Sequence, residues 1–174
     1  MLTERKIGLS ACVIAVLLLG LSVFAGQRVE SAPTASGASK TEAAGLTVSG
    51  AWIRLPAASG RPAGGYLTIA NSKIGTDALV RVTSSDAERI ELHSMRSDQG
   101  VMRMRQEQSL AVPEAGTLRL APGGKHLMLF GLASDVRAGG KLPLTLYFES
   151  GVTVDVTADV QAPGSDAPAG HHHH

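Results

Sequence analysis

Between Leu46 and Val160 the sequence consists of short stretches in which apolar and polar residues alternate, separated by Gly, Pro, Asn and Asp. Alternation with a period of two is typical of β-strands with one buried face, because successive side chains point to opposite faces. No stretch of this region shows the period of an amphipathic helix. The pattern predicts an all-β domain over residues 46–161, an antiparallel β-sandwich or barrel of about nine short strands. The expected strands are 46–54, 64–71, 77–84, 87–95, 101–106, 116–121, 126–132, 141–149 and 152–160.

Residues 1–25 have a different character. Two basic residues precede the uncharged, apolar run 7–25, which is typical of a secretory signal peptide cleaved after Ala25. The same run is long enough to span a bilayer, so an uncleaved membrane anchor is the competing interpretation. Lipid attachment is a third, since Leu9-Ser10-Ala11-Cys12 resembles a bacterial lipobox. Cys12 lies at the start of the apolar run rather than at its end, which favours a small apolar residue instead. All three interpretations place the domain outside the cytoplasm, in the periplasm or at the outer face of the cell membrane.

Two further segments flank the predicted domain. Residues 26–45 are rich in Ala, Ser, Gly and Thr and have no apolar period, which predicts a flexible linker. Residues 162–174 have the same composition and end in four histidines. This histidine run is open to two interpretations, the remainder of a purification tag and a native metal-binding tail. Its residues are His171, His172, His173 and His174.

Composition excludes several classes of function. A net charge of +1 argues against a nucleic-acid partner, which calls for a basic face. The single cysteine, Cys12, precedes the domain, which excludes a disulfide framework, a zinc site built from cysteines and a CxxC redox site. The sequence contains neither a Ser-His-Asp arrangement nor paired carboxylates at a suggestive spacing, so we do not expect an enzyme.

The histidines and methionines of the domain fall together between positions 93 and 128. They form three pairs with a spacing of two, so each pair shares one face of an extended strand. Imidazole and thioether together are ligands of a soft monovalent ion, above all Cu(I). Zinc would prefer cysteine, histidine or carboxylate, and a blue-copper centre needs a cysteine thiolate. The pairs are His93-x-Met95, Met102-x-Met104 and His126-x-Met128.

Each of these residues also has an ordinary structural interpretation. Methionine in an alternating strand is usually core filling, and Met102 and Met104 alternate with arginines as in a half-buried strand. A single histidine on a strand is more often hydrogen-bonded than metal-bound. The composition therefore leaves both a metal site and a metal-free adhesion or scaffold module open.

The spacing of these residues resembles the signature of the PCuAC family of periplasmic copper chaperones, which is His, ten residues, Met, twenty-one residues, then His-x-Met. Here ten residues separate His93 from Met104, and twenty-one more lead to His126 and Met128. The surrounding segments are also similar to that family over roughly residues 46–160. They are AWIRLP, GGYLTIAN, IELHSM, GVMRMR, LAPGGKHLMLFGL and LPLTLYFESG.

The resemblance implies a cupredoxin-like fold that binds Cu(I) through His93, Met104, His126 and Met128. It implies copper delivery to the CuA site during cytochrome c oxidase assembly, with a Sco-type copper protein and oxidase subunit II as partners. General copper storage or tolerance is the alternative function. Some relatives carry a C-terminal extension for a second copper, often Cu(II), so the resemblance favours a native tail at 171–174. Met95 and Met102 lie outside the signature. A role as spare ligands during transfer is one interpretation, and packing beside the site is the simpler expectation for both.

Overall fold

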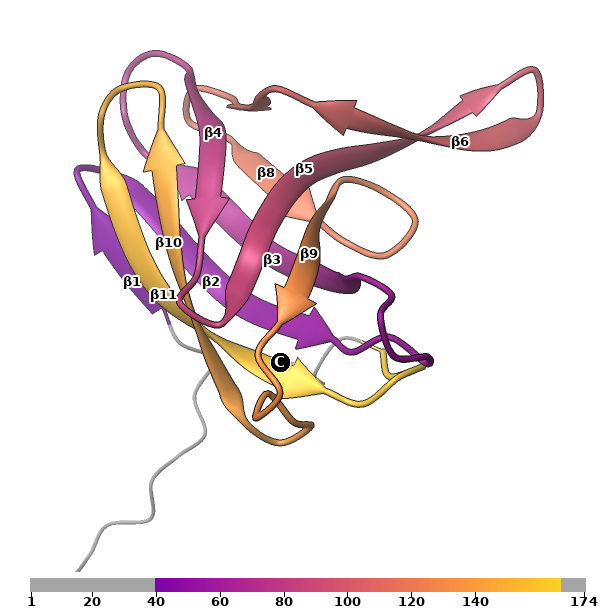
Figure 1. The fold of residues 1–174 in the computed structure, drawn as a ribbon. Coiled ribbons are helices and arrows are strands. Elements are labelled where there is room, and N and C mark those ends of the chain that lie inside the picture. The colour runs from indigo at the N-terminus through magenta and orange to yellow at the C-terminus, as the bar shows by residue number, and fades with distance from the viewer. Residues whose placement is uncertain (1–39, 167–174) are drawn as a thin grey trace, which may run out of the picture. The chain divides into compact units, whose positions relative to one another are not determined.

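The computed structural model describes residues 40–166. Over these residues the chain forms one mixed sheet of eleven strands (Figure 1). The described part contains no helix of the length and apolar character needed to cross a membrane. The strands are β1 (Lys40–Ala43), β2 (Leu46–Arg54), β3 (Ala63–Asn71), β4 (Asp77–Thr83), β5 (Ala87–Asp98), β6 (Val101–Glu107), β7 (Leu110–Val112), β8 (Thr117–Leu120), β9 (His126–Leu132), β10 (Lys141–Phe148) and β11 (Thr153–Gln161).

The all-β prediction is confirmed, and all nine expected strands are present, β2 and β9 with the expected bounds. Two strands were missed. β7 has three residues, too few to show an alternation. β1 corrects the predicted linker 26–45, because residues 40–43 pair with β2. Main-chain hydrogen bonds to a neighbouring strand do not require an apolar pattern, so composition alone could not find this strand.

Eight of the strands form the path β6-β5-β9-β3-β2-β11-β10-β4, and β7 extends it at the β4 end. All neighbours pair antiparallel except β11 and β2, which run parallel. β3 pairs with β9 through its first residues and with β8 through its last, so the sheet divides around this strand. The inner face of the sheet holds one continuous core of Leu, Val, Ile, Ala and Phe side chains. The histidine- and methionine-bearing strands β6, β5 and β9 lie together at one end of the path.

A bulge in β2 decides which side chains face away from the core. The pairing of β2 with β3 shifts between Ser49 and Trp52, and Gly50 has a φ of 60°. One extra residue reverses the alternation. The even-numbered residue Val48 faces the core before the bulge, and the odd-numbered residue Ile53 faces it after the bulge. Trp52 is thereby turned to the other face, where its ring lies 4.4 Å from that of Tyr66.

The hairpin of β5 and β6 is longer than predicted. Its turn is Gln99-Gly100, and both residues have positive φ, 50° and 82°. This is the backbone that a two-residue type I′ turn requires. β5 pairs with β9 only as far as His93. Beyond that point Met95 N donates a hydrogen bond to the carbonyl oxygen of Gly124 at 3.2 Å, and the remaining residues pair with β6 alone. The end of the hairpin therefore projects from the body of the sheet as a two-stranded ribbon (Figure 1).

Candidate metal centre

The two domain histidines are direct neighbours across two strands. His93 of β5 is the register partner of His126 of β9, and Glu91 is the partner of Met128. Directly opposed residues share one face of a sheet. The core-facing residues Leu92 and Leu127 occupy the other face. The ring centroids of the two histidines are 5.8 Å apart.

Each histidine has one ring nitrogen in a hydrogen bond and one ring nitrogen outside it. His93 Nε2 lies 2.9 Å from Glu91 Oε2, and His126 Nδ1 lies 3.0 Å from the carbonyl oxygen of Gly124. A carboxylate and a carbonyl accept hydrogen bonds, so the two nitrogens act as donors when the rings are neutral. The lone pairs then lie on His93 Nδ1 and His126 Nε2. A metal-binding histidine is commonly fixed by such a bond from its other nitrogen.

His93 Nδ1 is buried and has no hydrogen-bond partner within the described part of the chain. A buried polar atom without a partner is costly, so most such atoms in folded proteins are satisfied. Both histidines are only 9% exposed. The site therefore contains a shielded nitrogen that lacks a protein partner.

Glu91 carries a negative charge beside the histidine pair. Its hydrogen bond with His93 lowers the pKa of the carboxyl group, and the charge of Arg89 lowers it further. Arg89 Nε lies 2.8 Å from Glu91 Oε1. The carboxylate is thus held ionised between the arginine and the imidazole.

All four signature residues lie on the same face of these strands. Met128 follows His126 by two positions on β9. Met104 of β6 opposes Met95, which follows His93 by two positions on β5. Met104 and Met128 are therefore both diagonal neighbours of His93, on opposite sides of the histidine row. Long, unbranched thioether side chains can reach toward a diagonal neighbour.

The exposed fractions correct the core-filling interpretation of the β6 methionines. Met104 is 50% exposed and Met102 is 53% exposed. Neither packs in the core, and the expectation that Met102 packs beside the site is not met. The half-buried strand inferred from the alternation with arginines is exposed along six of its seven residues. Met95 is only partly exposed, which suits packing beside His93.

An aromatic pair adjoins the site on the same face. Met128 opposes Gly64 of β3, which in turn opposes Arg54 of β2. The Tyr66 ring leans over Gly64, since a Cβ there would lie 2.6 Å from Tyr66 Oη. Arg54 Nη2 donates a hydrogen bond to that hydroxyl at 2.7 Å, and the Trp52 ring packs against the tyrosine ring at a tilt of 36°. The absence of a side chain at position 64, the register partner of Met128, leaves room for the tyrosine ring.

Sequence reasoning missed Glu91 and the Gly124 carbonyl. The available signal was position, because Glu91 precedes His93 by two residues and shares its face. No group of three or more His, Cys, Asp or Glu side chains that could hold a metal occurs among residues 40–166. The predicted second site at 171–174 lies outside the described residues.

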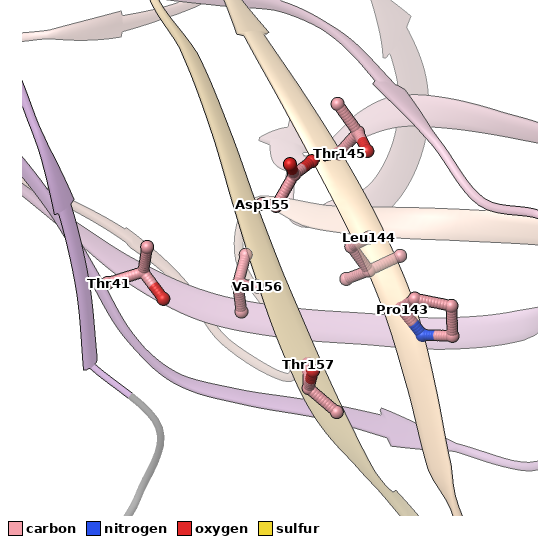
Figure 2. Close-up of a pocket in the computed structure, with 7 residues that line it drawn as sticks. All are labelled: Thr41, Pro143, Leu144, Thr145, Asp155, Val156 and Thr157. Carbon is pink, nitrogen blue, oxygen red and sulfur yellow. Dashed lines mark hydrogen bonds between the residues drawn. The ribbon is translucent and has the colours of Figure 1, made fainter.

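A shallow pocket of about 490 Å³ lies away from these strands (Figure 2). β1, β10 and β11 line it with Thr41, Asp155 and neighbouring residues. Asp155 is its one charged side chain, and it accepts a hydrogen bond from Thr145 at 2.7 Å. Among residues 40–166, those that line the pocket include no candidate ligand for a soft metal, so the histidine-methionine face is the better candidate site.

Known proteins resemble this chain in sequence. Residues 46–160 match the family model described as "LpqE-like: Putative lipoprotein LpqE-like". "Putative lipoprotein Lxx21020" from Leifsonia xyli subsp. xyli is 37% identical over 154 residues, which cover 88% of this chain and 89% of that protein.

Two solved structures share the fold. A copper-bound PCuAC domain from PmoF2 is 25% identical, with a TM-score of 0.62 over 72% of this chain and 99% of that domain. The apo form of DR1885 from Deinococcus radiodurans is 26% identical, with a TM-score of 0.54 over 85% of this chain and 99% of that one. The cupredoxin-like fold class is thereby confirmed. The chain belongs to the LpqE-like family, and its domain is a PCuAC domain.

Proposed function

We propose that this protein is an extracytoplasmic copper chaperone that carries Cu(I) on His93, Met104, His126 and Met128. The observation that carries the proposal is the buried, unpartnered Nδ1 of His93 beside His126. The similarity to a copper-bound PCuAC domain supports the choice of metal. The protein acts as a carrier, not as an enzyme.

The ligand types fit Cu(I) better than other ions. Thioethers are soft, bear no proton and are uncharged, so they favour a soft monovalent ion over zinc. Glu91 and the Gly124 carbonyl fix the two imidazoles in the tautomers that leave a lone pair for the metal. The half-exposed Met104 gives an incoming ligand access to one side of the ion.

Transfer then proceeds by exchange of ligands. The ion remains Cu(I), and the departing thioethers and imidazoles need no proton to leave. A recipient that offers cysteine thiolates gains the ion, because soft thiolates bind it more strongly than neutral thioethers. We propose a Sco-type copper protein and the CuA site of cytochrome c oxidase subunit II as recipients, on the family resemblance. General copper storage or tolerance is the alternative.

The recipient is tested by mixing the Cu(I)-loaded protein with the reduced, metal-free CuA domain or Sco-type protein under anaerobic conditions. We expect copper to move to either recipient within minutes. Retention of copper on the chaperone at equilibrium would favour storage.

The ligand set is tested by anaerobic competition for Cu(I) against a chromophoric chelator. We expect Met104→Leu combined with Met128→Leu to weaken Cu(I) binding at least tenfold. Arg103→Leu is the matched control, since Arg103 lies on β6 between the methionines and pairs with Asp98 at 3.4 Å. Unchanged affinity in the double variant would refute the ligand set. X-ray absorption should detect nitrogen and sulfur scatterers together.

We propose that the domain resides outside the cytoplasm. Residues 1–25 either attach it to the membrane or are cleaved to release it. The LpqE-like description and the Leifsonia relative both carry the word lipoprotein, which supports export with membrane attachment. The mass of the protein purified from cell envelopes distinguishes the three fates of the segment. Cleavage leaves residues 26–174, lipidation adds acyl mass at Cys12, and an anchor leaves the full chain.

We also propose a second copper site, for Cu(II), at His171, His172, His173 and His174. Four adjacent imidazoles offer the nitrogen ligands that Cu(II) prefers. Deletion of 171–174 should remove one equivalent of Cu(II) without changing Cu(I) affinity. Unchanged Cu(II) binding would show that the tail is inert.

A further inference from the structure

We propose that Met95, Met102 and Met104 form a second Cu(I) site, made of thioethers alone, on the projecting end of the β5–β6 hairpin. This inference rests on the proposed function, because Met104 also belongs to the histidine site. It assigns a role to Met95 and Met102, which the signature leaves without one. The shared methionine makes the new site an entry and exit point for the ion.

The register places the three side chains on one face. Met95 directly opposes Met104, and Met102 directly opposes Ser97. Met102 and Met104 are two residues apart on β6, and Met95 and Ser97 are two apart on β5, so all four positions share a face. Opposed Cβ atoms in antiparallel strands are about 5 Å apart and diagonal residues about 7–8 Å. Three flexible thioethers at these spacings can converge on one ion.

Core packing does not explain Met102 and Met104. Beyond His93, β5 has no β9 partner, so the ribbon that carries the methionines stands outside the core. Met102 and Met104 are each about half exposed. Methionine is usually retained in strands for filling irregular space inside a core, which is absent here.

The opposite face of the ribbon holds the hairpin together without the methionines. Arg96 Nη2 lies 3.3 Å from Glu107 Oε1, and Arg103 Nε lies 3.4 Å from Asp98 Oδ2. Ser94 Oγ donates a hydrogen bond to Glu107 at 2.6 Å. One face of the ribbon thus carries paired polar and charged side chains. The other face carries the thioether groups and no charged side chain. The thioether face is free to serve a ligand.

Cu(I) is the ligand that this chemistry recognises. Three neutral thioethers attract a soft monovalent ion and offer little to a divalent or hard cation. The site lacks imidazole, so it binds more weakly than the histidine site and fills after it, with the second lone pair of the Met104 sulfur completing the new site. An ion that arrives at Met95 and Met102 can keep Met104 while His93, His126 and Met128 replace the other two ligands. The charge of the ion and the protonation of the ligands do not change during this exchange.

The experiment is an anaerobic Cu(I) titration of the full chain, kept in detergent micelles and labelled with ¹³C at the methionine methyl groups. We expect the first equivalent of Cu(I) to shift the Met104 and Met128 methyl resonances. We expect the second equivalent of Cu(I) to shift the Met95 and Met102 methyl resonances. Copper taken by the terminal histidines would leave the Met95 and Met102 resonances unmoved.

Met102→Leu is the diagnostic variant, and Val101→Leu is its matched control on the opposite face of the exposed ribbon. We expect Met102→Leu to retain the first equivalent with unchanged affinity and to weaken the second at least tenfold. The thioether site is refuted if the Met95 and Met102 resonances never move, or if the variant loses the first equivalent too. If Met128 fails to shift while Met95, Met102 and Met104 do, the proposed function fails instead. Thermal unfolding of each variant checks that the hairpin is intact.

Discussion

The histidine pair shows how single side chains and carbonyl groups fix the orientation of an imidazole. Glu91 holds Nε2 of His93, so the buried Nδ1 is the nitrogen that is left bare. The carboxylate also places a negative charge beside the imidazole, and its pKa is lowered by the hydrogen bond with His93 and by the charge of Arg89. Without this partner, the imidazole could rotate or change tautomer, and its affinity for a metal would fall.

We therefore predict that Glu91→Ala weakens Cu(I) binding by about 10–100-fold, the usual effect of removing an outer partner of a histidine ligand. Glu91→Gln should lose less, because its amide oxygen can still accept the hydrogen bond from Nε2. Competition with a chromophoric chelator measures both. Glu107→Ala is the control, since Glu107 pairs with Arg96 on the opposite face. Equal losses in the Gln and Ala variants would contradict a role for the hydrogen bond.

At the residue scale the sequence predicted the four proposed ligands, but not the hydrogen-bond partners of the two histidines. The i, i+2 rule placed Met128 with His126 on one strand, and the spacing to Met104 matched a known signature. The same rule would have placed Glu91 beside His93. It could not show that Nδ1 of His93 is buried without a partner, because burial depends on packing between strands that are distant in sequence.

Among the elements, β3 and β9 support the metal face through close packing. Gly65 of β3 opposes Leu127 of β9, the residue between His126 and Met128. A Cβ at position 65 would lie 3.0 Å from Leu127 Cβ and 3.1 Å from Ile53 Cδ1. This is tighter than ordinary van der Waals contact, and the neighbouring atoms belong to the core.

We predict that Gly65→Ala lowers the free energy of unfolding by about 1–3 kcal/mol through overpacking. It should also weaken Cu(I) binding, because movement of β9 displaces two proposed ligands together. Urea denaturation measures the first effect and chelator competition the second. Gly124→Ala is the control for stability, since its Cβ would be in ordinary contact, 3.6 Å from Ala121 O. A fully stable Gly65→Ala protein would show that the strands can separate at no cost.

A buried carboxylate joins the start of β4 to the β10–β11 hairpin. Asp77 accepts hydrogen bonds from Ser150 Oγ at 2.6 Å, Ala78 N at 2.8 Å and Ser150 N at 3.2 Å. Lys73 Nζ lies 3.2 Å away. Burial alone would raise the pKa of Asp77, but these hydrogen bonds outweigh it and lower the pKa below the ordinary 3.8. The ionised form of Asp77 is therefore favoured more in the folded state than in the unfolded state.

We predict that Asp77→Ala lowers the free energy of unfolding by about 1–3 kcal/mol at neutral pH, since buried donors lose their acceptor. Because folding lowers the pKa, the ionised form contributes stability above pH 3.8. That contribution is lost as the pH falls through the lower folded value. Urea denaturation at pH 7 and at pH 2 should give a smaller difference between wild type and variant at the acid pH. A difference that does not change with pH would contradict this account.

For the whole domain, the alternation of apolar residues was enough to predict an all-β fold, because each strand buries one face. It was not enough to predict how the strands pair. The parallel contact of β2 with β11 joins the two ends of the domain, and local patterns carry no information about such a contact. The reversal at Gly50 likewise depends on a bulge that only the pairing with β3 reveals. Long-range pairing also decides that His93 and His126 meet.

Because the proposed ligands come from β5, β6 and β9, only the folded domain assembles them. Cu(I) should therefore stabilise the fold, by about 2.7 kcal/mol when free Cu(I) is one hundred times the dissociation constant. Protons compete for imidazole nitrogens, so this gain should shrink as the pH falls.

Anaerobic urea denaturation with buffered Cu(I) measures the gain, and the variant combining Met104→Leu with Met128→Leu serves as the reference. We expect the reference to gain much less than the wild type, because its ion retains only the imidazoles. The two methionines are removed without touching the core, since both lie on the outer face of the sheet. An equal gain in both proteins would mean that the stabilising copper binds elsewhere, and the histidine-methionine face would lose its place as the metal site.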